Sequence, residues 1–339
     1  MKHKDTTSLQ TPEAQTTRFY RDMVIMLCAP LVMAVYYYGL RVLVLAGVCV
    51  LTAVVCEFTG LLLMRRKIGD SFDFHCVFVG LVIALMLPAT APLSLGVTGA
   101  SFAIIAAKLP FGNARGTLFV SPAAGFAFLC VCWPTLVFDY PPIGGFGASV
   151  AAFQTVGSSL TSMLSTGYSL RLTIIHIFDI LSGNVPGPMG TGSILVLIAA
   201  SSYLLIRRPG ALLNTLGYLA GCAVMAAVFP RVQSGRLSSV FLELCSGMLF
   251  FTAVFLLTDP ATSPKKPLYR FYYGLFAGVL CMLLRYFGAY EEGACFALLI
   301  ANALWPFAES RLDKLKIRLT RKTRTPVTPN TARGGVADA

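Results

Sequence analysis

The chain alternates long apolar runs with short polar segments from about residue 23 to residue 307. Runs of roughly 17–25 apolar residues are long enough to cross a bilayer as helices. Several runs in this chain are shorter or contain Pro and Gly. The pattern predicts ten membrane-spanning helices, at about residues 23–39, 42–63, 74–91, 93–109, 117–138, 191–206, 211–229, 238–257, 271–288 and 293–307.

The composition indicates that lipid, not water, surrounds these helices. Of the 339 residues, 56% are hydrophobic and 12% are charged, and the mean hydropathy is +0.73. Soluble domains carry about 25% charged residues. The formal charge of +12 comes from short clusters between apolar runs and from a basic tail. Such clusters suit loops beside anionic lipid and not a nucleic-acid surface. We therefore predict an all-α polytopic membrane protein that binds no nucleic acid.

The positions of Lys and Arg predict the orientation. If the N-terminus is inside, 22 of the 27 Lys and Arg residues lie on the inner side. The five on the outer side are Arg41, Arg171, Arg231, Arg236 and Arg285. This bias places both termini in the cytoplasm. Residues 1–20 are polar, so we expect no cleavable signal peptide there.

The ten helices divide into two groups of five. A segment of low charge, 140–190, separates them and lies on the outer face by the same count. It contains an apolar stretch, 172–181, that is too short to span, and we expect a surface helix there. The predicted parts are a cytoplasmic segment 1–22, a first half 23–139, the outer connection 140–190, a second half 191–308 and a basic, partly disordered tail 309–339.

A short internal repeat supports the division into halves. The third span of each half is followed by Pro-Ala-Thr-x-Pro, at residues 88–92 and 260–264. One span later, each half contains Phe-Gly, at residues 111–112 and 287–288. With five spans per half, the two copies face opposite sides of the membrane. The pattern therefore predicts two five-helix inverted repeats, a design in which functional sites tend to lie near the repeat interface.

Several kinds of chemistry are absent from the sequence. The ten Cys lie mostly in apolar runs without CxxC spacing, so we expect buried apolar side chains and no metal or protein-held iron–sulfur cluster. His75 and His176 have no ligand partner nearby in sequence. No catalytic triad, P-loop or dinucleotide fingerprint appears. The chain alone should neither bind NAD nor supply a catalytic residue.

Four stretches of sequence carry a resemblance to a known family. They are DFHCVFVGLVIALMLP at 73–88, FGNARGTLFVSPAAG at 111–125, FDILSGNVPGPMGTGS at 178–193, and 251–302, which includes TDPATSP and LLRYFGAYEEGACFALLIAN. In these stretches the chain resembles the family of membrane proteins that includes the D subunit of the Rnf complex and the B subunit of the sodium-pumping NADH:quinone oxidoreductase. The likeness covers nearly all ten predicted helices.

The resemblance implies a role in a bacterial inner (plasma) membrane. Such complexes pass electrons between ferredoxin and NAD and drive Na⁺ or H⁺ across the membrane, and either ion stays open here. The chain would be one component of this oxidoreductase (a translocase), not catalytic alone. Its partners would be membrane, flavin and iron–sulfur subunits, a flavin transferase and the bilayer. FMN would be joined to a Thr hydroxyl by a phosphoester bond. Riboflavin or a second flavin is also compatible with the family.

Thr161 is the predicted FMN acceptor, within VGSSLTSML at 156–164. The family pattern resembles Asp-Gly-x-Ser-Gly-Ala-Thr-Pro-Leu, and Gly157, Thr161 and Leu164 match it. Ser159 lies nearby. Val156, Leu160 and Ser162 depart from the pattern, which puts recognition by the transferase in doubt. A flexible loop of small residues would let an enzyme reach the hydroxyl. Thr166 is a weaker alternative acceptor, and an ordinary Ser/Thr-rich loop is the competing interpretation.

Two further segments are candidates for contact with the flavin. The turn at 183–190 includes Asn184, Pro186 and Gly187, and its backbone N–H groups could face a flavin phosphate. A tight loop capping a helix explains the same residues. The family's Glu-Thr is replaced here by Thr-Gly at 191–192. Asp259 lies at the inner membrane edge, with Lys265 and Lys266 as candidate partners, and it either lines an ion or flavin pocket or caps a helix.

Charged side chains within the spans are the remaining candidates. Glu57 and Glu243 lie in apolar runs, where a carboxylate serves ion transfer or is held by bundle-interior hydrogen bonds. Arg285, Glu291 and Glu292 form a charged cluster at the outer end of the ninth span, for which we expect a structural ion pair.

Two other functions stay open. One is a transporter or channel with an inverted-repeat fold and no flavin, which the substitutions around Thr161 and at 191–192 favour. The other is a flavinylated subunit of a different membrane electron-transfer circuit, which the outer position of Thr161 permits.

The predicted orientation can be tested by cysteine labelling. A cysteine introduced after Arg311 should react with a membrane-impermeant maleimide only from the inner side, because the Lys/Arg bias holds the tail inside. One introduced between residues 140 and 150 should react only from the outer side. Labelling of the tail from outside would overturn the orientation.

Overall fold

A computed structural model describes residues 12–65, 74–111, 118–141, 159–165, 174–232, 235–288 and 290–323. Gly157 and Thr166, both named above, lie outside the described residues. The chain divides into two compact units, residues 1–303 and residues 304–339. Every regular element in the described ranges is a helix.

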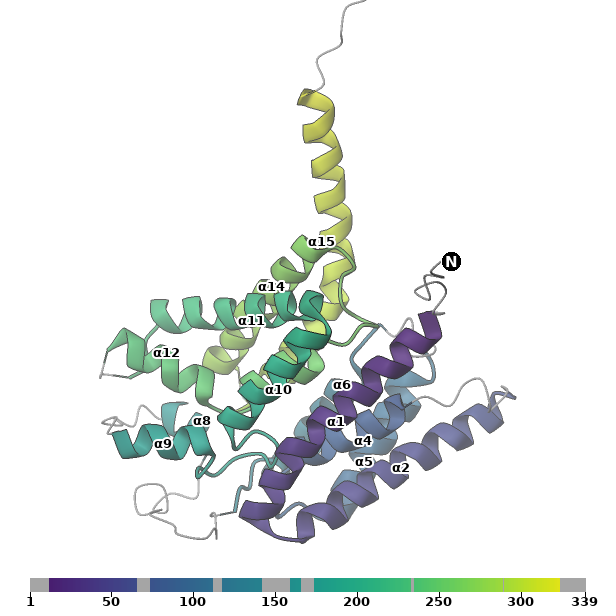
Figure 1. The fold of residues 1–339 in the computed structure, drawn as a ribbon, viewed down its shortest axis with the longest axis vertical. Coiled ribbons are helices and arrows are strands. Elements are labelled where there is room, and N and C mark those ends of the chain that lie inside the picture. The colour runs from purple at the N-terminus through teal and green to yellow at the C-terminus, as the bar shows by residue number, and fades with distance from the viewer. Residues whose placement is uncertain are drawn as a thin grey trace, which may run out of the picture. The chain divides into compact units, whose positions relative to one another are not determined.

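The helices up to residue 141 form the first predicted half (Figure 1). They are α1 (Pro12–Tyr38), α2 (Arg41–Leu63), α4 (His75–Met86), α5 (Leu93–Phe102) with the π-helix η1 (Ala103–Lys108), α6 (Ser121–Cys132) and α7 (Pro134–Val137). Two short helices follow, α8 (Leu160–Ser165) and α9 (Ile174–Ser182). The later helices are α10 (Ile194–Arg207), α11 (Pro209–Val228), α12 (Arg236–Cys245), α13 (Leu249–Phe251) with η3 (Thr252–Leu256), α14 (Pro267–Phe287) and α15 (Ala294–Thr323).

Helices occupy each of the ten apolar segments predicted from the sequence, and α9 occupies the predicted short helix. Among the described residues, α1, α2, α11 and α14 are long and apolar enough to cross a membrane. A fifth span results if α12 and the following helix, bent by 65° at a short break, are counted together. The helices α4, α5–η1, α6 and α10 are shorter apolar helices. The all-helical polytopic fold is therefore confirmed.

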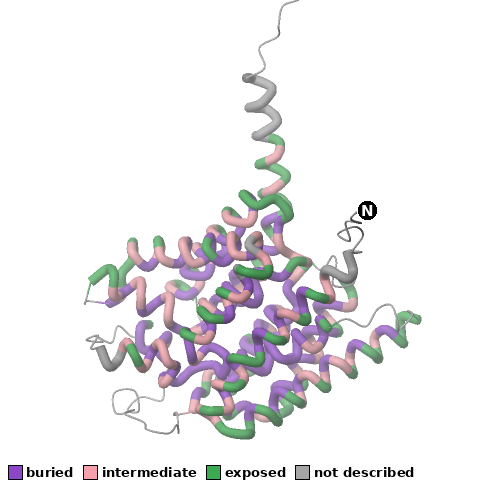
Figure 2. The backbone as a smooth tube through the Cα atoms, in the orientation of Figure 1, coloured by how far each residue is buried: buried purple, intermediate pink, exposed green. Residues whose placement is uncertain are grey.

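The centre of the first half is α4. Every residue of α4 except Val77 is buried (Figure 2), as expected for a helix that is hydrophobic on all sides. It packs against α1, α2, α5 and α6. By contrast, α2 buries one face and exposes Leu43, Val44, Leu51 and Val55 on the other. Lipid would cover that exposed face in a bilayer.

The tightest helix pair in the second half is α11 with α14, which lie side by side in Figure 1. A Cβ at Gly274 would lie 2.2 Å from the carbonyl oxygen of Asn214, and one at Gly217 would lie 2.3 Å from that of Phe271. Gly221 and Gly278 meet the facing backbone in the same way. Each helix thus carries a Gly-xxx-Gly pair, which lets two backbones approach closely in a membrane.

The two Pro-Ala-Thr-x-Pro segments both form turns, and residues just before each turn bond to distant parts of the chain. Leu85 and Leu87, at the end of α4, accept hydrogen bonds from the N–H groups of Gly190 (2.7 Å) and Met189 (3.2 Å), just before α10. Near the second turn, Asp259 accepts a hydrogen bond of 2.8 Å from the Tyr20 hydroxyl on α1. The relation of the two halves as inverted repeats stays a prediction.

Asp259 is held differently from the sequence prediction. Its side chain accepts hydrogen bonds from Tyr20 and, at 3.1 Å, from the N–H of Ala261. Asp259 is 1% exposed, whereas Lys265 and Lys266 are exposed, and the Lys266 ammonium lies over the Tyr269 ring. The expected pairing with the two lysines is therefore wrong. Burial raises the pKa of the Asp259 carboxyl to about 6, although its two hydrogen bonds lower it.

The close approach of α11 and α14 predicts the effect of adding one methyl group. Gly274→Ala should lower the melting temperature of the detergent-solubilised protein, because overpacking costs about 1–3 kcal/mol. Gly47→Ala on α2 is the matched control, since nothing lies within 4 Å of a Cβ built there. Equal melting temperatures for the two variants would contradict the packing argument.

Asp259 should make stability depend on pH. The pKa of its carboxyl in the folded chain is above the ordinary value of 3.8, so the folded state binds more protons than the unfolded state between about pH 4 and pH 6. Stability is then highest below pH 4 and falls as the pH rises through 6.

Asp259→Asn keeps an acceptor for Tyr20 and cannot ionise. Its gain in unfolding free energy over the wild type should grow by about 1.5 kcal/mol from pH 5 to pH 7.5, and its melting temperature should rise relative to the wild type accordingly. Tyr20→Phe should shift the pH dependence of stability to higher pH, because it removes a hydrogen bond that lowers the pKa of Asp259. An advantage that stays constant over this pH range would contradict the assignment.

Candidate functional site

Thr161 lies on a packed helix and not in an open loop. Ser159 begins this helix, α8, by accepting a hydrogen bond of 3.1 Å from the Ser162 N–H through its hydroxyl, as helix-capping serines do. Apolar side chains of α8 pack into a buried cluster, whose members are Leu160, Met163, Leu164, Ile180, Val185, Ile194, Val232 and Leu242. Thr161 itself is only 2% exposed. The prediction that a modifying enzyme reaches it in an exposed loop is therefore wrong for this packed state.

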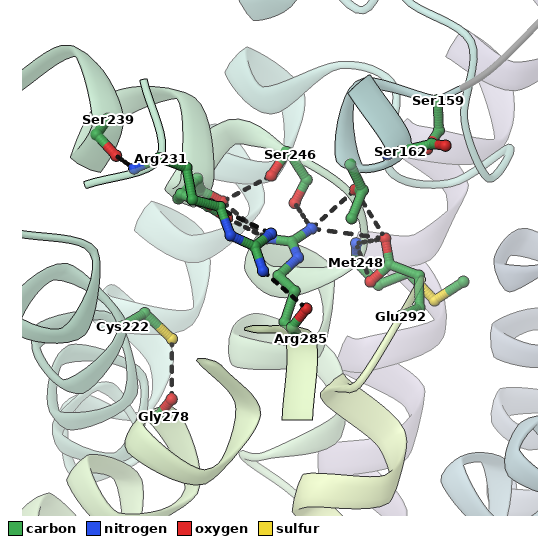
Figure 3. A network of polar contacts seen from close by, with 12 residues as sticks. Ser159, Ser162, Cys222, Arg231, Ser239, Ser246, Met248, Gly278, Arg285 and Glu292 are labelled. Carbon is green, nitrogen blue, oxygen red and sulfur yellow. Dashed lines mark hydrogen bonds and ion pairs between the residues drawn. The ribbon is translucent and has the colours of Figure 1, made fainter. Parts of the chain in front are cut away.

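The hydroxyl of Thr161 is part of a buried charge network centred on Arg285, and Figure 3 shows Arg285 with its partners Ser246 and Glu292. The Arg285 Nη2 donates to Thr161 Oγ1 at 2.8 Å and to the Ser246 carbonyl oxygen at 3.0 Å. Its Nη1 donates to the Glu243 backbone oxygen at 3.1 Å and to Glu243 Oε2 at 3.2 Å. The Arg285 side chain is 1% exposed. The predicted structural ion pair is confirmed, and it includes the predicted flavin acceptor.

Glu292 is the second partner of Thr161. Its Oε1 accepts the Thr161 hydroxyl at 3.2 Å, and the backbone N–H of Met248 lies 3.2 Å from each carboxylate oxygen. Arg285 Nη2 lies 3.7 Å from the same Oε1. Burial raises the pKa of Glu292, and Arg285, Met248 and Thr161 oppose the rise. Burial beside Glu292 also raises the pKa of Glu291, to about 8, so Glu291 is mostly neutral at pH 7.

The contacts with Glu292 and Arg285 depend on a break within the eighth apolar segment. The helix α12 ends at Cys245, and Gly247 adopts φ +60° before α13 begins. The break turns the Ser246 carbonyl and the Met248 N–H toward Arg285 and Glu292 (Figure 3). Sequence reasoning missed Ser246 and Met248, because it treated 238–257 as one span. The available signal was a Ser-Gly pair within an apolar run.

The Gly/Pro turn forms one wall of a cleft beside α8. Gly183, with φ +98°, ends α9, and the chain then turns back toward α10. The cleft is small, about 30 Å³, and its lining includes Ser159, Leu160, Pro186, Gly187, Thr191, Gly192 and Gly247. Three of the predicted site residues, Ser159, Pro186 and Gly187, thus line the same space next to Thr161.

Other parts of the turn have structural partners. The Asn184 side chain donates to Asp179 Oδ1 at 3.4 Å, and its N–H bonds to the Asp179 carbonyl at the end of α9. The N–H groups of Met189 and Gly190 bond to the end of α4. For these residues the helix-capping and loop interpretation holds, because their N–H groups are bonded within the protein. Contact of the turn's other N–H groups with a flavin phosphate stays a prediction.

Two predicted residues lie outside this network. Asp259 and Arg285 flank opposite ends of α14, a helix of 21 residues or roughly 30 Å. Asp259 is thus not part of the Thr161 network, and its predicted place in an ion or flavin pocket stays a prediction. Glu57, on α2, forms a buried ion pair of 2.7 Å with Lys108 at the end of η1. Glu57 and Glu243 are thus both charge-paired. No group of His, Cys, Asp or Glu in the described ranges could hold a metal ion.

Comparison with known proteins gives relatives along most of the chain. A protein from Acetobacterium woodii, named as the D subunit of a Na(+)-translocating ferredoxin:NAD(+) oxidoreductase complex, is 29% identical over 306 residues, covering 89% of this chain and 90% of the relative. Proteins named as the D subunit of an ion-translocating oxidoreductase complex are 27% identical in Colwellia psychrerythraea (81% of this chain, 86% of the relative) and 26% identical in Halorhodospira halophila (89% and 90%).

The family model described as the NQR2, RnfD, RnfE family matches residues 6–317. That range contains every described helix except the last turns of α15. Together with the helical membrane fold, the match confirms the resemblance drawn from the four sequence stretches. The chain belongs to the NQR2, RnfD, RnfE family.

Proposed function

We propose that the chain is the membrane subunit of a redox-driven, ion-translocating electron-transport complex of the ferredoxin/NAD type, and that it carries FMN on Thr161. The family match and the names of the relatives support the first part, since similar chains are named as the D subunits of such complexes. The observation that carries the second part is the 2.8 Å contact between Thr161 Oγ1 and the buried guanidinium of Arg285.

The residues around Thr161 fit a phosphoester in their charge. An FMN phosphate linked to a hydroxyl keeps one negative charge, and a guanidinium is the side chain best suited to hold it. Arg285 would bind this phosphate, and Ser159, Pro186 and Gly187 would face the organic part of the cofactor from the cleft. Two carboxylates oppose it: that of Glu292, next to the hydroxyl, and that of Glu243, on the same guanidinium.

Attachment of FMN to Thr161 is a group transfer, so the bonds formed and broken must balance. The class of donor that fits is a flavin dinucleotide, in which the FMN phosphate forms an anhydride with a second nucleotide. The anhydride P–O bond breaks, a P–O bond to Thr161 Oγ forms, and the second nucleotide leaves with its phosphate while the hydroxyl releases its proton. Because Thr161 is 2% exposed, the flavin transferase would act before α8 packs into its buried cluster.

Once bound, FMN would supply one- or two-electron redox chemistry. The protein's contribution would be to fix the cofactor at one point and to keep water from the linkage. The apolar residues of α8 bury the linkage, and the Arg285 network holds it near the outer ends of the second-half helices. Neighbouring membrane and iron–sulfur subunits would then exchange electrons with this fixed position.

Covalent flavin on Thr161 can be tested directly. The chain is produced together with its flavin transferase and run on a denaturing gel, where the wild-type band should show flavin fluorescence and the Thr161→Ala band should show none. Ser165→Ala is the matched control, because Ser165 lies on the same helix, is exposed and donates to the Ser162 backbone carbonyl. It should fluoresce like the wild type.

Two results would contradict the proposal in different ways. Fluorescence that persists in Thr161→Ala and disappears in Thr166→Ala would move the acceptor to Thr166. A wild-type band without covalent flavin would remove the flavin assignment and favour an inverted-repeat transporter.

A further inference from the structure

Two hydrogen-bond donors and one ion-pair partner from different parts of the chain surround the Glu292 carboxylate. They are the Thr161 hydroxyl on α8, the Met248 N–H at the start of α13, and the Arg285 guanidinium on α14. Glu292 is 3% exposed and Arg285 is 5% exposed. A buried carboxylate is stable only when donors of this kind surround it. The group is therefore a closed anion site, and Glu292 fills it.

The backbone leaves room for this site. At Gly247, with φ +60°, a Cβ would lie 1.8 Å from Glu292 Oε1 and 2.6 Å from Arg285 Nη2. No other residue type would leave the carboxylate and the guanidinium in place, and the positive φ itself favours Gly. The break between α12 and α13 thus creates the anion site as well as the bend in the helix.

A phosphoester on Thr161 would have to enter the same site. Phosphorus bonded to Thr161 Oγ carries two non-bridging oxygens, and both lie closer to that atom than Glu292 Oε1 does at 3.2 Å. Those oxygens would meet the Arg285 Nη2 that now donates to the hydroxyl. Two anions cannot share one guanidinium and one N–H without strong repulsion in a buried setting.

We propose that Glu292 is a stand-in for the phosphate: its carboxylate holds the Arg285 and Met248 donors in the unmodified chain, and the FMN phosphodiester takes them over when Thr161 is modified. This inference rests on the proposed attachment of FMN at Thr161. Beyond that ester, one anion replaces another on the same donors, and the displaced Glu292 carboxylate takes up a proton, so that the buried site keeps one negative charge. Arg285 is then a positioning residue for the phosphate, and Glu292 keeps the site ordered until the flavin arrives.

The exchange predicts in which variants FMN attachment raises the melting temperature and in which it lowers it. Each variant is produced with and without the flavin transferase, and the melting temperatures of the modified and unmodified forms are compared. In the wild type the difference should be small. In Glu292→Gln, modification should raise the melting temperature by roughly 2 °C or more, because the phosphate restores a missing anion. In Arg285→Gln, it should lower the melting temperature by a similar amount, because the phosphate then faces Glu292 without the guanidinium.

Matched controls are available elsewhere in the chain. Glu57→Gln removes another buried, paired carboxylate, and Arg41→Gln removes an outer arginine that binds the Thr90 and Ala91 carbonyls. In both, modification should change the melting temperature no more than in the wild type. If Arg285→Gln does not accumulate, Arg285→Lys keeps the charge. The phosphorus NMR resonance of the attached phosphodiester should then move in Arg285→Lys and stay in place in Arg41→Lys.

The outcomes separate this inference from the proposed function. Suppose the wild type carries flavin, but modification changes the melting temperature of all variants alike and the phosphorus resonance stays in place in Arg285→Lys. The exchange is then wrong, while the flavin assignment stands. If the wild type carries no covalent flavin, both fail.

Discussion

A charged group can remain in the apolar interior of a helical bundle only when partners surround it. Arg285 is the clearest case in this chain. Its guanidinium joins Glu243 on α12, the Ser246 carbonyl at the helix break, Thr161 on α8, and Glu292 between α14 and α15. Removing one partner of such a network leaves an unpaired buried charge, which typically costs several kcal/mol. The arrangement of these four segments therefore depends on one side chain.

The same requirement applies to the backbone wherever a helix ends within the bundle. The N–H groups of Met189 and Gly190 satisfy carbonyls at the end of α4, and Met248 gives its N–H to Glu292. Irregular backbone at membrane depth is tolerated only where protein groups satisfy it. This is why the Gly/Pro turn and the break after Cys245 lie against other elements. Both irregular segments border the space beside Thr161, so a structural necessity also shapes the candidate site.

Much of the fold was predictable because lipid imposes a simple rule. Apolar length locates the helices, and all ten segments and the short α9 were found in this way. The resemblance carried by four stretches also indicated the family correctly. The sequence also placed Arg285 and Glu292 in one charged cluster, and it identified Thr161 separately. Nothing in a linear pattern shows that Thr161 meets this cluster, because α8 and α14 come together only in the packed bundle.

The errors have related causes. Residues 159–165 look like a loop of small side chains, yet Leu160, Met163 and Leu164 give α8 an apolar face that binds a cluster formed by other segments. Asp259 has two lysines close in sequence, yet its partner is Tyr20 on α1. Closeness in sequence therefore does not indicate which donor binds a buried carboxylate in the folded chain.

By itself, the sequence determined that lipid surrounds this chain, where its ten apolar segments form helices, and which residue types are available for chemistry. These follow from local composition and periodicity, which tertiary structure cannot change. The family was indicated separately, by the motifs of four stretches. Tertiary packing alone decided that Thr161 is buried, that Arg285 donates to it, and that Glu292 completes an anion site with the Met248 N–H. Those facts depend on the directions and distances between elements. Burial makes an unpaired charge costly, so the partners of each charge are fixed only after the helices have packed.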